Sequence, residues 1–167
     1  MERWSHSVWV LLHAFALSCN EDKYEEWLEN MKDIHNLIVC GLCWNDYKKF
    51  VTKYEETNPN YMKDSINAFK FTVDIHNHVN EKLGKPIINS YNEALESIKI
   101  FASSKPISEW RTIIYNIFTV NIFPNLIHDN PNDIEVYKQK ILKVLKYVEI
   151  NITDYVFENI KTFPEVI

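Results

Sequence analysis

Two of the three cysteines, Cys40 and Cys43, stand in a C-x-x-C spacing within the stretch LIVCGLCWNDYKKF. Proteins use this spacing for zinc ligation, for a structural disulfide or for thiol–disulfide exchange. Cys40 directly precedes an expected helix from about residue 41 to 56. Unpaired backbone N–H groups at a helix start lower the pKa of a nearby thiol, so this position favours redox chemistry.

Zinc ligation and a structural bridge explain the pair less well. A closed zinc site takes four ligands, and the chain adds only six scattered histidines to the two cysteines. His76 and His78 are two positions apart on an expected helix, about 200° around its axis, and cannot both face one ion. A disulfide across three residues closes too small a loop to restrict the unfolded chain much. We therefore expect no metal, with metal ligation by the pair kept as an alternative.

A second set of polar residues lies on expected helix faces that are otherwise apolar. Inner positions recur every three or four residues from 62 to 83, and His76 and Asn80 are the polar members of that stripe. The first helix similarly carries Trp9 and His13 four positions apart. A buried imidazole or amide without a partner costs about 1–3 kcal/mol. Either these groups are satisfied core residues, with His bonded to a carboxylate and Asn to a backbone carbonyl, or they surround a ligand.

Long helices must position these residues. Helical periodicity is found over 5–18, 22–38, 41–56 and 62–84, and the last segment ends at LGKP, where Gly84 can adopt the left-handed terminal conformation. We expect an all-α fold with these four segments as a bundle. Further helical segments cover 91–103, 106–122, 131–150 and 152–162. Residues 1–95 are expected to form one domain, with a short fifth helix, and residues 96–167 an added helical module.

The charge and the hydropathy pattern argue against nucleic-acid binding, secretion and a membrane span. The 167 residues carry a net charge of −5 without a basic cluster, which argues against binding to nucleic acid. The apolar N-terminal run is interrupted by polar residues and has a weak basic flank, which fits neither a signal peptide nor a membrane span. We expect a soluble, non-secreted protein.

Three segments together resemble the Erv-type FAD-dependent sulfhydryl oxidases. They are W-x(4)-W-x(2)-L-H from Trp4 to His13, the C-x-x-C pair, and H-N-x-V-N-x-K-L-G-K-P from His76 to Pro86. The resemblance covers about residues 3 to 95 and implies a helical bundle that holds FAD. It implies contacts to the cofactor from the following residues: Trp9, His13, His76, Asn77, Asn80, Lys82, Lys85 and Tyr91.

The resemblance also implies a reaction. A substrate thiolate attacks Cys40, a second substrate thiol completes the exchange, and Cys43 on the flavin side passes the electron pair to FAD. Oxygen then takes the electrons, which yields hydrogen peroxide. The implied partners are a dithiol protein substrate or a small redox carrier protein, and a second copy of the chain in a homodimer.

The chain departs from the family pattern at several positions. Val39 replaces a usual proline, Leu17 a usual aromatic residue and Phe71 a usual tryptophan. Thr52 and Val73 lie where the family commonly has a structural disulfide between helices.

A second, shuttle C-x-x-C is also missing, and Cys19 on the apolar stripe of the first helix is expected to be a buried hydrophobe. Members without a shuttle resemble those of large DNA viruses, and the Asn-, Ile- and Lys-rich composition agrees with a viral source. The location would then be the host cytoplasm or the virion. The alternatives are a non-enzymatic helical interaction module and a flavin-free dithiol carrier.

Overall fold

The computed structural model describes residues 6–19, 21–32, 41–122, 134–157 and 160. Every regular element in these ranges is helical, which confirms the expected all-α class. In chain order the elements are α1 (His6–Ala16), the 3-10 turn η1 (Glu21–Lys23), α2 (Tyr24–Lys32), α3 (Gly41–Thr57), α4 (Ser65–Lys82), α5 (Tyr91–Ser103), α6 (Ile107–Ile122), α7 (Ile134–Asn151) and the short π-helix η5 (Ile152–Phe157).

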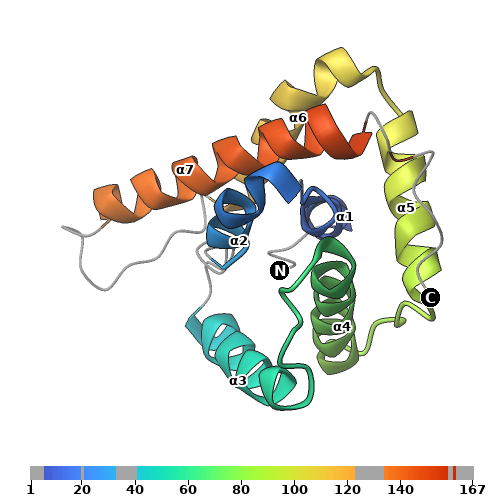
Figure 1. Ribbon diagram of the computed structural model, residues 1–167, viewed down its shortest axis with the longest axis vertical. Coiled ribbons are helices and arrows are strands. Elements are labelled where there is room, and N and C mark those ends of the chain that lie inside the picture. Colours follow the sequence, from blue (N-terminus) through green and yellow to red (C-terminus); the bar gives the residue numbers. More distant parts are fainter. Residues whose placement is uncertain (1–5, 20, 33–40, 123–133, 158–159, 161–167) are drawn as a thin grey trace.

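Helix α1 lies at the centre of the fold. Its sequence is apolar on almost every side, and Leu11, Ala14 and Phe15 have no exposed surface. A helix that is hydrophobic all round must be covered all round. Helices α4, α5 and α6 and the π-helix η5 pack against it, and Figure 1 shows α4, α5 and α6 arranged around it.

Helix α4 begins and ends at defined caps. The Asp64 side chain accepts a hydrogen bond from the backbone N–H of Asn67, so the helix starts at residue 65, three positions later than expected. At the other end Gly84 has a φ of +66°, as predicted. The N–H groups of Lys85 and Gly84 donate to the carbonyls of Asn80 and Glu81, at 2.8 and 3.1 Å, which is a Schellman cap.

Helix α3 lies beside α4 through aromatic contacts (Figure 1). The Phe71 ring of α4 lies 6.3 Å from that of Phe50, 5.2 Å from that of Tyr54 and 4.8 Å from that of Tyr61, between centroids. Phe71 is 1% exposed. The aromatic ring therefore anchors the helix that follows Cys40 against the helix that carries His76.

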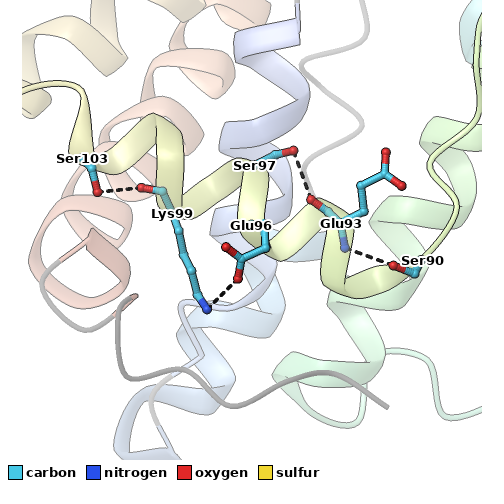
Figure 2. A network of polar contacts seen from close by, with 6 residues as sticks. All are labelled: Ser90, Glu93, Glu96, Ser97, Lys99 and Ser103. Atoms are coloured by element: carbon cyan, nitrogen blue, oxygen red, sulfur yellow. Dashed lines mark hydrogen bonds and ion pairs between the residues drawn. The ribbon is translucent and has the colours of Figure 1, made fainter.

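Helix α5 places an apolar face on α1 and a polar face in solvent. Ala94, Leu95 and Ile98 are buried in the core. The polar residues of this segment bond among themselves: Figure 2 shows Ser90 capping the N–H of Glu93, Ser97 and Ser103 bonding back along the helix, and Lys99 paired with Glu96 at 2.8 Å. The polar face is thus an ordinary solvated helix surface.

The C-terminal helices share the core of the N-terminal ones. Trp110 of α6 is 1% exposed, and its Nε1–H donates to the Ala102 carbonyl at 3.1 Å. Its ring lies against those of Phe101 and Phe157, and residues of α7 and η5 pack with α1 in one continuous cluster. The expected boundary between residues 1–95 and 96–167 stays a prediction, with the core running across it.

Within the described part of the chain, no helix is both long enough and apolar enough to cross a membrane.

Candidate functional site

Trp9 of α1 and His76 of α4 form the centre of the candidate site. Their rings are stacked, with centroids 4.2 Å apart and planes 5° apart. His13, one turn along α1, lies with its ring centroid 5.2 Å from that of His76 and 6.2 Å from that of Trp9. Trp9 is half-buried while His13 and His76 are 2% and 8% exposed. Three of the predicted site residues are therefore brought together.

The positions follow from helix geometry. Residues four apart share one helix face, so Trp9 and His13 both face α4, while Phe69, Thr72 and His76 form a row on α4 that faces α1. The Phe69 ring meets the His13 ring edge-on at 6.1 Å. Phe69 is fully buried and closes the inner end of the cluster.

A hydrogen-bonded chain runs through the cluster. The Thr72 hydroxyl donates to the Phe69 carbonyl at 2.7 Å, and the same oxygen lies 2.9 Å from His13 Nδ1. His13 Nε2 lies 3.0 Å from His76 Nδ1. Thr72 was not among the predicted site residues. The sequence pattern that could have identified it is a hydroxyl residue four positions before an inward histidine, on the same helix face.

Both imidazoles are held in the neutral form. Burial, and then the neighbouring charge of His76, lower the pKa of His13 well below 6.5. Burial, followed by the charges of His6 and Lys85, lowers the pKa of His76 to about 4. At neutral pH each ring therefore has one N–H donor and one acceptor nitrogen.

Asn77 and Asn80 bond to the loop that follows α4. Asn77 Nδ2 donates to the Ile88 carbonyl at 2.9 Å, and the Ile88 N–H donates to Asn77 Oδ1 at 2.7 Å. Asn80 Nδ2 donates to the Pro86 carbonyl at 3.1 Å. The family resemblance implied that both amides contact a cofactor, and the sequence also allowed Asn80 to bond to a backbone carbonyl; the backbone of the returning loop bonds to both amides. Their contact with a cofactor stays a prediction.

The two predicted lysines lie at the same end of α4. Lys82 Nζ makes an ion pair with Asp46 Oδ1 of α3 at 2.6 Å, and His78 Nε2 lies 3.0 Å from the other oxygen of Asp46. Asp46 was missed by the sequence reasoning, which had no signal for a contact between α3 and α4 at this position. Lys85 follows the cap, and its charge acts on His76.

Tyr91 lies outside the aromatic cluster. Its hydroxyl donates to Asp74, 3.1 Å from Oδ1, and Tyr54 of α3 donates to Oδ2 of the same carboxylate at 2.7 Å. Asp74 and His76 are two positions apart on α4, about 200° around the helix. Burial, and then the Asp74 charge, raise the pKa of Tyr91 to about 12. The structure thus gives Tyr91 a part in joining α3, α4 and α5.

The structure describes the three cysteines to different extents. Cys43 lies in the first turn of α3, with its side chain outside the described part, and Cys40 itself lies outside the described residues. Cys19 is a free, partly buried thiol that packs against the core. Burial and the charges of Asp64 and Glu21 raise its pKa, which keeps the sulfur protonated and unreactive.

The described residues have no cluster of three or more His, Cys, Asp or Glu side chains that could hold a metal ion. The donor set of the aromatic cluster instead suits an organic ligand. A stacked indole and imidazole give a planar surface, the imidazole adds one polar atom, and the nearby Lys85 charge favours an anionic group.

Comparison with known proteins agrees with this chemistry. The model of the Erv1 / Alr family matches residues 6–100. A probable FAD-linked sulfhydryl oxidase of Acanthamoeba polyphaga mimivirus is 32% identical over 103 residues, covering 59% of this chain and 70% of its own. FAD-linked sulfhydryl oxidases from two African swine fever virus isolates are each 25% identical over 126 residues, covering 68% of this chain and all of their own. No solved structure matches the chain significantly.

Proposed function

The chain belongs to the Erv1/Alr family, and on that premise we propose that it is an FAD-linked sulfhydryl oxidase that turns protein dithiols into disulfides. The observation that carries the proposal is the Trp9–His76 stack backed by the neutral His13 imidazole, inside the matched segment. The similar proteins are named as FAD-linked sulfhydryl oxidases and come from viruses, which also supports the expected viral source.

The residues present fit a flavin nucleotide. The face formed by Trp9 and His76 would hold a flat ring system, and Lys85 would hold a phosphate. Asn77, Asn80 and Lys82 would act mainly by holding the loop and α3 in place, because each already has a partner in the protein. The chemistry that FAD supplies when bound is two-electron transfer from the reduced cysteine pair to oxygen, with hydrogen peroxide as product.

The cysteine pair would carry out the thiol chemistry. A substrate thiolate attacks Cys40 Sγ, the S–S bond to Cys43 breaks, and Cys43 leaves as a thiolate. The second substrate thiol, as thiolate, attacks the substrate sulfur of the mixed disulfide and releases the Cys40 thiolate. The substrate has then lost two electrons and two protons and holds a new disulfide, while the pair has become a dithiol.

The surroundings of α3 support this role. Cys43 is the third residue of the helix, and no acidic residue lies in its first turn. A cysteine in the first turn of a helix generally has its thiolate form favoured by the unpaired N–H groups and the positive end of the helix dipole. A cysteine with a lowered thiol pKa is a better leaving group in thiol–disulfide exchange.

The protonated Cys19 thiol makes a poor shuttle, so we propose that substrate dithiols reach Cys40 directly. We also propose a homodimer and a location in the host cytoplasm or the virion, which rest on the family resemblance and on the viral relatives.

Oxygen uptake tests the proposal. Purified protein reconstituted with FAD should show bound flavin absorbance and consume oxygen when given dithiothreitol or a reduced protein, with hydrogen peroxide as product. Cys43→Ser should retain FAD and lose oxygen uptake, while Cys19→Ser, the matched control, should keep both. Protein that cannot bind FAD, or full turnover by Cys43→Ser, would contradict the proposal.

A further inference from the structure

We propose that Thr72 is a positioning residue that fixes the tautomers of His13 and His76, so that His76 offers an unprotonated Nε2 to whatever binds beside Trp9. A ligand that forms a hydrogen bond to this nitrogen must then carry an N–H or O–H donor at that point. The tautomer assignment stands on the protein alone, and its application to FAD rests on the proposed function.

The chain of bonds has a fixed direction because it ends on a carbonyl. A carbonyl oxygen only accepts, so the 2.7 Å bond to Phe69 uses the one hydroxyl proton of Thr72. The Thr72 oxygen has lone pairs left but no proton to give. His13 Nδ1, 2.9 Å away, must therefore be the donor, which places the proton of His13 on Nδ1.

The proton on His13 Nδ1 in turn fixes the proton position on the second ring. His13 is buried and neutral, so with its proton on Nδ1 its Nε2 is an acceptor. His76 Nδ1, at 3.0 Å, can bond to that acceptor only as an N–H donor. His76 is neutral as well, so its Nε2 carries a lone pair.

The direction in which this atom points is also constrained. The His76 ring is held flat against the Trp9 indole, within 5° of parallel, and one of its nitrogens is fixed by His13. A 180° flip of the His76 ring would put the Cδ2–H carbon in place of Nδ1 and remove the hydrogen bond to His13 Nε2. Both the plane of the ring and the identity of the outer nitrogen are thus set by neighbouring residues.

This arrangement gives the site a rule for its ligand. An amino, amide or hydroxyl group can bond to His76 Nε2, whereas a phosphate or carboxylate oxygen would bring two lone pairs together. An anionic part of the ligand must therefore be held elsewhere, and Lys85 is a cation whose charge acts on this histidine. In FAD, the group facing His76 would be a ring N–H, an amino group or a hydroxyl.

Ring-nitrogen NMR of protein with isotope-labelled histidine, prepared without FAD, tests the assignment directly. Wild-type protein should show His13 and His76 protonated at Nδ1 and bare at Nε2. Thr72→Val, which keeps the shape but removes the hydroxyl, should change the tautomer signals of both rings. Thr72→Ser should restore them. An Nε2–H signal for His76 in the wild-type protein, or unchanged tautomers in Thr72→Val, would overturn the proposal.

FAD titration then tests the proposed binding of FAD separately from the positioning role of Thr72. Thr72→Val should weaken FAD binding by about tenfold, roughly 1.4 kcal/mol, because the outer nitrogen becomes a mixture of donor and acceptor. Thr72→Ser should bind FAD as the wild type does. If the tautomers are as stated but the wild-type protein does not bind FAD, the proposed function fails and the positioning role of Thr72 stands.

Discussion

Lys82 Nζ lies 2.6 Å from Asp46 Oδ1, and this ion pair joins the end of α4 to α3. Asp46 is three positions after Cys43 in the sequence of α3. His78 contacts the second oxygen of the same carboxylate at 3.0 Å. The helix start that holds Cys43 is thus tied to the helix that holds His76 by one carboxylate with two partners.

Replacing that carboxylate should loosen the connection. Asp46→Asn removes the charge and is expected to lower the free energy of unfolding by about 0.5–1 kcal/mol at neutral pH, the upper part of the range for partly exposed pairs. Burial alone would raise the pKa of Asp46, but its bonds to Lys82 and His78 outweigh burial and lower it below 3.8. The contribution is therefore present above that pH and is lost as the pH falls below it.

Urea unfolding of Asp46→Asn measures this effect. Glu96→Gln provides the control, because Glu96 pairs with Lys99 on the solvent face of α5 (Figure 2) and its loss should change the free energy by less than about 0.5 kcal/mol. Equal effects of the two substitutions would show that the α3–α4 pair has no special role.

The two buried histidines should make the protein sensitive to mild acid. Their folded pKa values lie below the ordinary 6.5, so the unfolded chain binds more protons and stability is lost as the pH falls from 6.5 towards the pKa of about 4 for His76. Each neutral imidazole gives a slope of up to about 1.4 kcal/mol per pH unit. The free energy of unfolding should thus fall by about 1.5 kcal/mol per histidine between pH 6.5 and 5.

Unfolding curves measured across that range check the slope. His76→Gln should flatten it by about half, while the same change at the exposed His6 should leave most of it. A pH-independent free energy in the wild-type protein would mean that the imidazoles are not held neutral.

The cap of α4 offers a test of backbone conformation alone. Gly84 has a φ of +66°, and a Cβ added there would have no atom within 4 Å. Gly84→Ala should therefore lower the free energy of unfolding by about 1–2 kcal/mol through backbone strain without any clash. Gly84→Asn should cost less, because asparagine tolerates the left-handed region. Urea midpoints of the two variants give the comparison, and equal midpoints would contradict it.

Much of the fold could be predicted because its signals are periodic. The middle of the α4 stripe, Phe69, Val73, His76 and Asn80, is buried as expected. The ends are not: Ile66 and Leu83 are 37% and 61% exposed. Periodicity gives the face of a helix, but the neighbours that cover it decide how far along the helix burial extends.

The candidate site, too, could be predicted only in part from the sequence. The Trp9, His13 and His76 cluster followed from polar residues on apolar stripes, because a buried imidazole needs a partner. A backbone carbonyl was one of the partners expected for Asn80, but the particular groups that Asn77 and Asn80 bond to could not be predicted, since they belong to the following loop, whose path depends on tertiary packing. A carbonyl acceptor has no sequence signal.

A substitution at Asn77 can distinguish a structural role of this amide from a role in cofactor binding. Its amide makes two bonds to the backbone of Ile88, at 2.9 and 2.7 Å, so Asn77→Ala leaves both backbone groups without their partner. The free energy of unfolding of protein without FAD should fall by about 1–3 kcal/mol. Asn89→Ala, whose exposed side chain bonds to Glu93, should change it by less than about 0.5 kcal/mol. If Asn77→Ala instead unfolds like the wild type without FAD and fails only to retain the flavin, the amide serves the cofactor and not the loop.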